Sequence, residues 1–154
     1  MHATTRRPTA GAEHGFTLVE VLVTLAVLAI ISSIAVAALV NALDKAKQRA
    51  TMADMRTISK AIEIYMMDTD GTPPDDSGGM TGLSSVLVPI QSQVLPLADH
   101  WQHVYGYVAD AGGNYTLESY GKDGADGADV SVASNLDFNL DIVLVNGVFV
   151  AAPE

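Results

Sequence analysis

The sequence contains no cysteine among its 154 residues. This absence excludes disulfide bonds, thiolate nucleophiles and every zinc site that needs a cysteine ligand. Aromatic residues make up only 6% of the chain although 49% of it is hydrophobic, so Ala, Val, Leu and Ile supply most of the apolar content. These residues are concentrated between positions 16 and 43. A chain of this length forms one domain, or one domain with an anchor.

Basic residues are nearly missing from the C-terminal part of the chain. From Asp68 onward there are 13 acidic residues and one basic residue, Lys122. Such a surface repels nucleic acid, whose binding depends on Lys and Arg side chains that contact phosphates. It keeps a domain soluble or supplies oxygen ligands to a divalent cation. No catalytic arrangement such as a Ser/His/Asp set or a phosphate-binding loop is recognisable, so we expect a protein that is not an enzyme.

One long apolar run dominates the N-terminal part. From Val21 to Val40 the only polar residues are Thr24, Ser32 and Ser33. At 1.5 Å per residue these 20 residues span about 30 Å, the thickness of the hydrocarbon core of a bilayer. The run therefore predicts a transmembrane helix.

An amphipathic pattern continues this helix. Residues 44–67 contain no Gly or Pro and place Met55, Ile58, Ile62 and Tyr65 at spacings of three and four, on one face of a helix. We therefore expect a single helix over residues 16–67, which ends at the Gly- and Pro-rich stretch that follows.

The rest of the chain predicts short elements of an antiparallel sheet. Residues 103–109 and 115–121 are strand candidates joined by a Gly-rich turn, and residues 82–94 contain one short helical turn. Residues 136–152 form a hairpin pattern, because Asn146-Gly147 between two β-branched runs suits a type I′ turn. The expected fold class is α+β, with a long N-terminal helix and a small C-terminal sheet.

The start of the apolar segment carries a specific motif. Gly15 is followed by Phe-Thr-Leu-Val-Glu and then by the long apolar helix, which resembles the N-terminus of type IV pilins and pseudopilins. The resemblance implies that prepilin peptidase, a membrane-embedded aspartic peptidase, removes residues 1–15 and methylates the new N-terminal Phe16. Glu20 becomes the fifth residue of the mature chain.

Glu20 needs an explanation, because a charged side chain at the bilayer centre costs about 3 kcal/mol. The resemblance to pilins implies that Glu20 is the counter-charge for the α-amino group of Phe16 in a neighbouring subunit. This pair sets the axial register between the two subunits. Two other interpretations remain. Glu20 is the border residue of an ordinary anchor, or the segment is a secretory signal peptide cleaved after the small residues 35–37.

A narrower resemblance extends over the second half of the chain. Three segments are similar to the major pseudopilin of type II secretion. They are the helix and the Pro-bearing loop over residues 41–74, the Asp-His-Trp segment at residues 99–101, and the stretch from Tyr115 to Val130. In that family the last stretch binds calcium. Asp123 and Asp129 match the motif, and Asp126 is an additional candidate ligand. The alternative for this loop is a solvated acidic turn without metal. The separate cluster of residues around Trp101 indicates local packing.

The resemblance implies a function in assembly. The protein would be a structural subunit of a type II secretion pseudopilus, anchored by a single pass in the bacterial inner membrane. It would polymerise with itself and with minor pseudopilins through residues 16–43, and an inner-membrane assembly machinery would extract it. Residues 44–67 continue the helix, and residues 68–154 form the periplasmic part. The alternatives are a type IV pilus pilin for adhesion, motility or DNA uptake, and a signal-cleaved soluble binding domain.

The basic residues around the apolar run conflict with this orientation. Arg6 and Arg7 precede it, whereas five basic residues follow it, namely Lys45, Lys47, Arg49, Arg56 and Lys60. The positive-inside rule alone would place the C-terminal part in the cytoplasm. The family resemblance implies the opposite orientation, with which an acidic, calcium-binding loop agrees.

Overall fold

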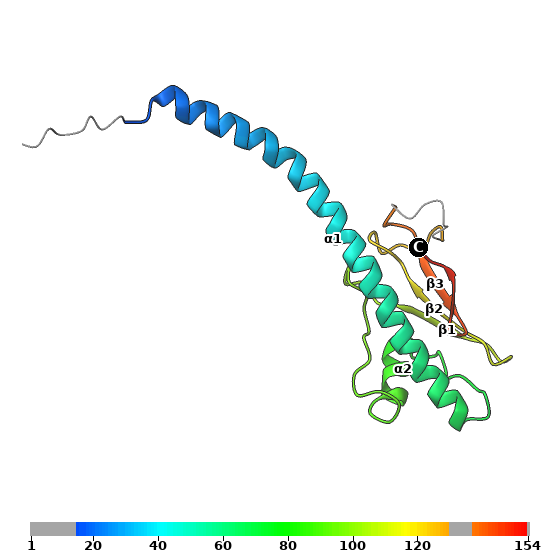
Figure 1. Ribbon diagram of the computed structural model, residues 1–154. Helices are drawn as coiled ribbons and strands as arrows, with labels where there is room; N and C mark the ends of the chain where they lie inside the picture. The colour runs from blue at the N-terminus through cyan, green and yellow to red at the C-terminus, as the bar shows by residue number, and fades with distance from the viewer. Residues whose placement is uncertain (1–14, 130–136, 154) are drawn as a thin grey trace, which may run out of the picture. The chain divides into compact units, whose positions relative to one another are not determined.

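The computed structural model describes residues 15–129 and 137–153 (Figure 1). The chain divides into two compact units, residues 1–40 and 41–154, and the boundary lies inside the first helix. The helices and strands are α1 (Leu18–Asp68), α2 (Gly79–Leu87), β1 (Gly106–Ala109), β2 (Tyr115–Ser119), β3 (Ile142–Val145) and β4 (Val148–Ala151). This is the α+β, pilin-like arrangement that the sequence predicts.

Helix α1 is a single element of 51 residues. It begins after Thr17, whose Oγ1 accepts the backbone N–H of Glu20 at 3.3 Å, as expected of an N-cap. Its last turn is closed by the backbone N–H of Gly71, which donates to the carbonyl of Met66 at 2.8 Å. The predicted helix over residues 16–67 is therefore confirmed to within two residues at each end.

The first unit exposes the apolar half of α1 on all sides. Every residue from 16 to 40 is solvent-exposed, and α1 is long and apolar enough to cross a membrane. The hydroxyl groups of Thr24 and Ser33 donate to the carbonyls of Val21 and Ile30, at 2.9 and 2.8 Å. These polar groups are thus satisfied within the helix, as an apolar environment requires.

The second unit has one hydrophobic core, between the second half of α1, α2 and the sheet. The apolar face predicted for the helix lies in this core, with Met55, Ile58 and Ile62 fully buried and Tyr65 at the margin. Opposite them lie residues from the sheet and from α2, namely Leu117, Ile142, Leu144, Leu83 and Leu87. The hydroxyl groups of Ser59 and Tyr115 lie 2.9 Å apart and add a buried hydrogen bond to this contact.

The sheet is an antiparallel meander in the order β1-β2-β3-β4. The predicted hairpin is confirmed, because Asn146 and Gly147 both have positive φ angles, 48° and 81°, as a type I′ turn requires. The first strand is shorter than predicted, because Val104 forms an isolated bridge to Ala98 and the carboxylate of Asp99 accepts the backbone N–H of His103. Helix α2 begins three residues before the predicted helical turn. Leu136, the predicted start of the hairpin, lies outside the described residues.

Candidate functional site

The proposed processing site lies at the start of α1. Residues 1–14 of the predicted leader lie outside the described residues, and Gly15 and Phe16 precede the helix, with Phe16 80% exposed. Glu20 lies in the first turn, where a carboxylate interacts favourably with the helix dipole. Among the described residues its carboxylate has no hydrogen-bond or ion-pair partner.

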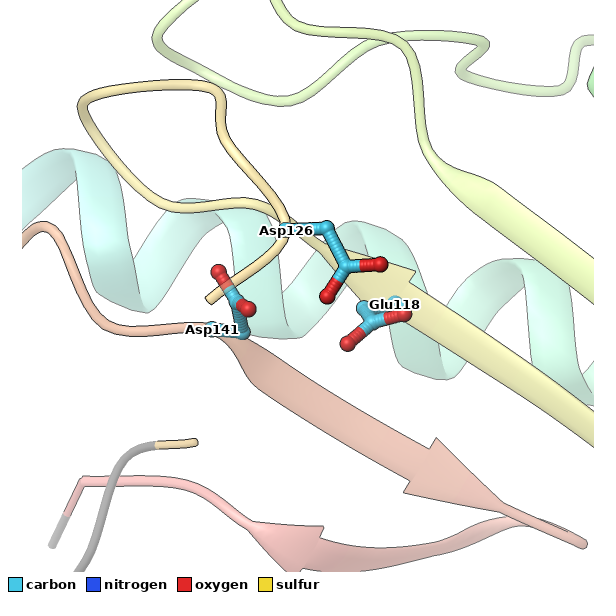
Figure 2. A group of neighbouring side chains, drawn as sticks. All are labelled: Glu118, Asp126 and Asp141. Carbon is cyan, nitrogen blue, oxygen red and sulfur yellow. The ribbon is translucent and has the colours of Figure 1, made fainter. Parts of the chain in front are cut away.

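Three carboxylates converge at one end of the sheet. Figure 2 shows Glu118 of β2, Asp126 of the Gly-rich loop and Asp141, immediately before β3, pointing toward one another. Ligand oxygens of the three side chains all lie within 4.8 Å of one another. Glu118 is half-buried, Asp126 is exposed and Asp141 is fully buried. Oxygen-only groups in this arrangement suit a hard divalent cation such as Ca²⁺.

Asp141 has one carboxylate oxygen without a partner. Its Oδ2 accepts the backbone N–H of Gly127 at 2.7 Å, and its own N–H donates to the carbonyl of Ala128 at 3.1 Å. Its Oδ1 is buried and accepts no hydrogen bond from any described residue. Because a buried acceptor without a partner costs about 1–3 kcal/mol, this oxygen favours a proton or a cation beside it.

The electrostatics of the three carboxylates also favour a proton or a cation at this site. Burial raises the pKa of Asp141, the hydrogen bond from Gly127 opposes this shift, and the charges of Asp126, Asp123 and Asp129 add to it. Burial also raises the pKa of Glu118, and the charges of Asp141, Asp126 and Asp129 add to that shift. Folding therefore disfavours the fully ionised form of the cluster, and a bound cation would reduce the repulsion among its carboxylates.

The structure places the three predicted ligands differently. Only Asp126 joins the converging carboxylates, whereas Asp123 accepts the backbone N–H of Ala125 at 3.1 Å and Asp129 forms a backbone bridge to Asp141. The sequence reasoning did not find Glu118 and Asp141. Glu118 occupies an outward position of an alternating strand, and Asp141 directly precedes an apolar run. The sequence could have indicated these two residues only as acidic residues near the ends of predicted strands.

The acidic loop is attached to α1 by an ion pair. The Nζ of Lys122 lies 2.7 Å from the Oδ2 of Asp44, and the indole N–H of Trp101 donates to the other oxygen at 3.3 Å. The hydrogen bond from Lys122 holds the pKa of Asp44 below its ordinary value. The cluster around Trp101 thus packs locally, as the sequence indicates; His103 contacts the carbonyl of Gly121 at 2.9 Å.

Replacing Lys122 by methionine should lower the free energy of unfolding at pH 7 by about 1–2 kcal/mol, because Asp44 stays buried with one weak partner. Folding lowers the pKa of Asp44, so the stability gained from the pair is present above the ordinary Asp pKa of about 4 and is lost as pH falls. Denaturant titration at pH 7 and below pH 4 measures both effects. Lys60→Met is the matched control, because Lys60 is exposed and does not act on Asp44; an equal deficit in both variants would contradict the role of the ion pair.

Gly124→Ala should disturb the loop beside the acidic cluster. Gly124 has a φ of +69°, and a Cβ there would lie 2.7 Å from ring atoms of His103. A non-glycine residue in this conformation costs about 1–3 kcal/mol. We expect the variant to unfold at a lower denaturant concentration than the wild type, measured on the purified protein. Gly127→Ala is the control, since its nearest contact would be an ordinary 3.6 Å; an unchanged midpoint in Gly124→Ala would show that the loop tolerates a Cβ at this position.

Two family descriptions match the chain. Residues 38–135, more than half of the sequence, match the family Type II secretion system (T2SS), protein G. Residues 11–36 match the Prokaryotic N-terminal methylation motif. No solved structure matches the chain.

Curated relatives agree with these families. The chain is 25% identical over 132 residues to the Type II secretion system core protein G of Klebsiella michiganensis, which covers 80% of this chain and 93% of the relative. The protein of the same name from Xanthomonas campestris pv. campestris is 26% identical over 126 residues, covering 80% and 88%. The one from Vibrio cholerae is 34% identical over 64 residues, covering 42% and 44%.

These matches confirm the resemblance drawn from Gly15, Phe16 and Glu20 and from the C-terminal half. They do not favour a type IV pilus pilin or a signal-cleaved soluble domain. The long apolar helix followed by a small antiparallel sheet is the architecture that the resemblance implied. The chain therefore belongs to the type II secretion system protein G family and is a pseudopilin.

Proposed function

We propose that prepilin peptidase cuts this chain between Gly15 and Phe16, methylates Phe16, and so releases a subunit that polymerises through residues 16–43. The resulting pseudopilus would drive protein secretion, a structural rather than an enzymatic role. The observation that carries the proposal is the methylation motif over residues 11–36, which overlaps the start of a helix whose apolar half is exposed on all sides. Such a surface needs a lipid or a protein environment.

Glu20 would act during polymerisation. Cleavage creates an α-amino group on Phe16 at the end of an apolar helix, and burial of that charge is costly unless it is paired. The carboxylate of Glu20 has no partner among the described residues and would pair with Phe16 of a neighbouring copy. Its main effect would be on axial register, because a shifted subunit would leave both charges unpaired.

The proposed location follows from the anchor. The precursor would be a single-pass protein of the inner membrane with residues 68–154 in the periplasm. Its partners would be prepilin peptidase, the assembly machinery, minor pseudopilins and further copies of itself. The support is the single described helix that is long and apolar enough to cross a membrane, together with the family match.

The acidic cluster would hold Ca²⁺. Glu118, Asp126 and Asp141 would supply carboxylate oxygens, with the buried and unpartnered Oδ1 of Asp141 as the best-placed one. Asp123 and Asp129 flank Asp126 in the same exposed loop, and they stay proposed as further ligands because Ca²⁺ takes six to eight oxygens. Bound calcium would stabilise the folded domain and the loop that Lys122 ties to α1.

Deletion of the gene in its native host tests the proposal. The deletion should abolish export of secreted proteins into the medium, and the wild-type chain should restore it. Normal export together with the loss of surface filaments would contradict a secretion role and indicate a type IV pilus.

A further inference from the structure

Four basic residues form a stripe along one flank of α1. Lys45, Arg49, Arg56 and Lys60 are all exposed, and at 100° per residue they lie within about 60° of one another around the helix. The stripe extends for about 22 Å along the helix axis. Below, these four residues are called the basic stripe.

The charges of the basic stripe are not neutralised within the described chain. The two ion pairs among described residues are His100–Asp54 and Lys122–Asp44, and neither includes a stripe residue. Arg56 lies over the ring of Phe149, 5.1 Å from its centroid, which orients the guanidinium but supplies no carboxylate. Beyond Lys60, the carboxylate of Glu63 accepts the hydroxyl of Ser59. The stripe is thus a cationic surface to which no described residue supplies a carboxylate partner.

We propose that the basic stripe docks onto the acidic C-terminal part of a second copy of this chain, and this inference rests on the proposed polymerisation. The charge complementarity is strong, because residues from Asp68 onward carry 13 acidic groups and one basic group. Two of the exposed acidic side chains there, Asp68 and Asp70, have no hydrogen bond or ion pair to described residues and are not among the proposed calcium ligands.

The position of the stripe along the chain favours a second copy. It begins five residues after Val40, on the same helix whose apolar segment would be covered by neighbouring copies in the filament. A neighbour that covers that segment would also carry the acidic residues from Asp68 onward, which are the anionic groups that the assembly supplies in excess. The stripe thereby also explains why basic residues follow the apolar segment although the positive-inside rule disfavours them there.

Anionic lipid headgroups fit the stripe less well. Arg56 and Lys60 follow Val40 by 16 and 20 residues, which correspond to about 24 and 30 Å of helix. Electrostatic attraction to a membrane surface decays over about 8 Å at physiological ionic strength. Lipids would therefore account for Lys45 and not for the full length of the stripe.

A matched pair of charge reversals tests the proposal. Arg49 belongs to the stripe, whereas Lys47 is also exposed but lies about 160° away around the helix. Losing one attractive contact and gaining a repulsive one should reduce the filament yield of the full-length Arg49→Glu chain about tenfold. Lys47→Glu should assemble like the wild type. Both variants should keep the wild-type thermal midpoint in detergent, because neither side chain is buried.

Each outcome of this comparison has one meaning. Equal yields from Arg49→Glu and Lys47→Glu would overturn the stripe while leaving the pseudopilus intact. Failure of the wild-type chain to polymerise would instead overturn the proposed function. Normal filaments of Arg49→Glu, with weaker binding to phosphatidylglycerol vesicles, would overturn the stripe in favour of a lipid surface.

Zero-length carbodiimide cross-linking of filaments identifies the contact itself. Filaments assembled from a mixture of ¹⁴N and ¹⁵N copies should give mixed-isotope peptides that join Lys45 or Lys60 to an acidic residue beyond Asp68. Mixed-isotope links from Lys47 in place of Lys45 and Lys60, or none from these two lysines, would overturn the proposal.

Discussion

Cells that express Glu20→Ala should contain a correctly cleaved and methylated chain but almost no filaments. The substitution leaves Gly15 and Phe16 unchanged, and the cap of α1 depends on the Thr17 hydroxyl and the backbone N–H of residue 20, so processing and helix formation are retained. Assembly should fall more than about a hundredfold, since an unpaired charge buried away from water costs several kcal/mol. Sheared-filament yield and the mass of the N-terminal peptide measure the two effects.

Two companion variants separate charge from size and polarity. Glu20→Gln keeps the shape of the side chain and should fail to assemble as fully as Glu20→Ala. Thr24→Ala removes another polar group of the same apolar segment, one that donates to the carbonyl of Val21, and should assemble normally. Abundant filaments of Glu20→Gln would refute the counter-charge and leave Glu20 as a border residue.

Asp141→Asn should abolish the response of thermal stability to calcium. A ligand that binds only the folded state at a hundred times its Kd stabilises that state by about 2.7 kcal/mol, or roughly 10 °C for a domain of this size. Asparagine can still accept the N–H of Gly127 through its amide oxygen, but it removes the charge beside Glu118 and Asp126. The wild-type midpoint should therefore rise with calcium and fall with chelator, whereas that of the variant should not move.

The same variant should be more stable than the wild type when calcium is absent at pH 7. Folding raises the pKa of Asp141, so the folded state binds more protons than the unfolded state between the ordinary Asp pKa of about 4 and the raised value. The contribution of Asp141 to stability is thus fully present below pH 4 and is lost as pH rises through the raised pKa. The advantage of Asp141→Asn should shrink as pH falls toward 4.

Asp137→Asn is the control for both measurements, because Asp137 is exposed and lies outside the converging carboxylates. It should keep the calcium response and the pH profile of the wild type. A wild-type midpoint that is indifferent to chelator would reject the metal site and restore the interpretation as a solvated acidic turn.

The fold was predictable because its elements follow local rules. The apolar run and the three-and-four spacing of Met55, Ile58 and Ile62 each specify a helix face, and Asn146-Gly147 has φ angles that few other dipeptides adopt. The length of β1 was less predictable, because a contact outside the strand ends it. The side chain of Asp99 accepts the backbone N–H of His103, and nothing in the local sequence reveals that hydrogen bond.

The acidic site was predictable only in its loop. Three aspartates, Asp123, Asp126 and Asp129, recur at every third position of one loop and can be recognised together in the sequence. Glu118 and Asp141 are far apart in the sequence and come close to this loop only through strand pairing. The register that places Ser119 opposite Ile142 brings the neighbouring residues Glu118 and Asp141 to the same end of the sheet. Registers of this kind depend on tertiary packing, which a single sequence does not reveal.

The intact mass and the N-terminal peptide of the protein, isolated from its native membranes, test the central claim most directly. The account predicts a chain that begins at N-methylated Phe16, as processing by prepilin peptidase requires. A chain that begins at Ala38 would contradict it and indicate a cleaved signal peptide, and an uncut Met1 would contradict it in favour of an ordinary membrane anchor.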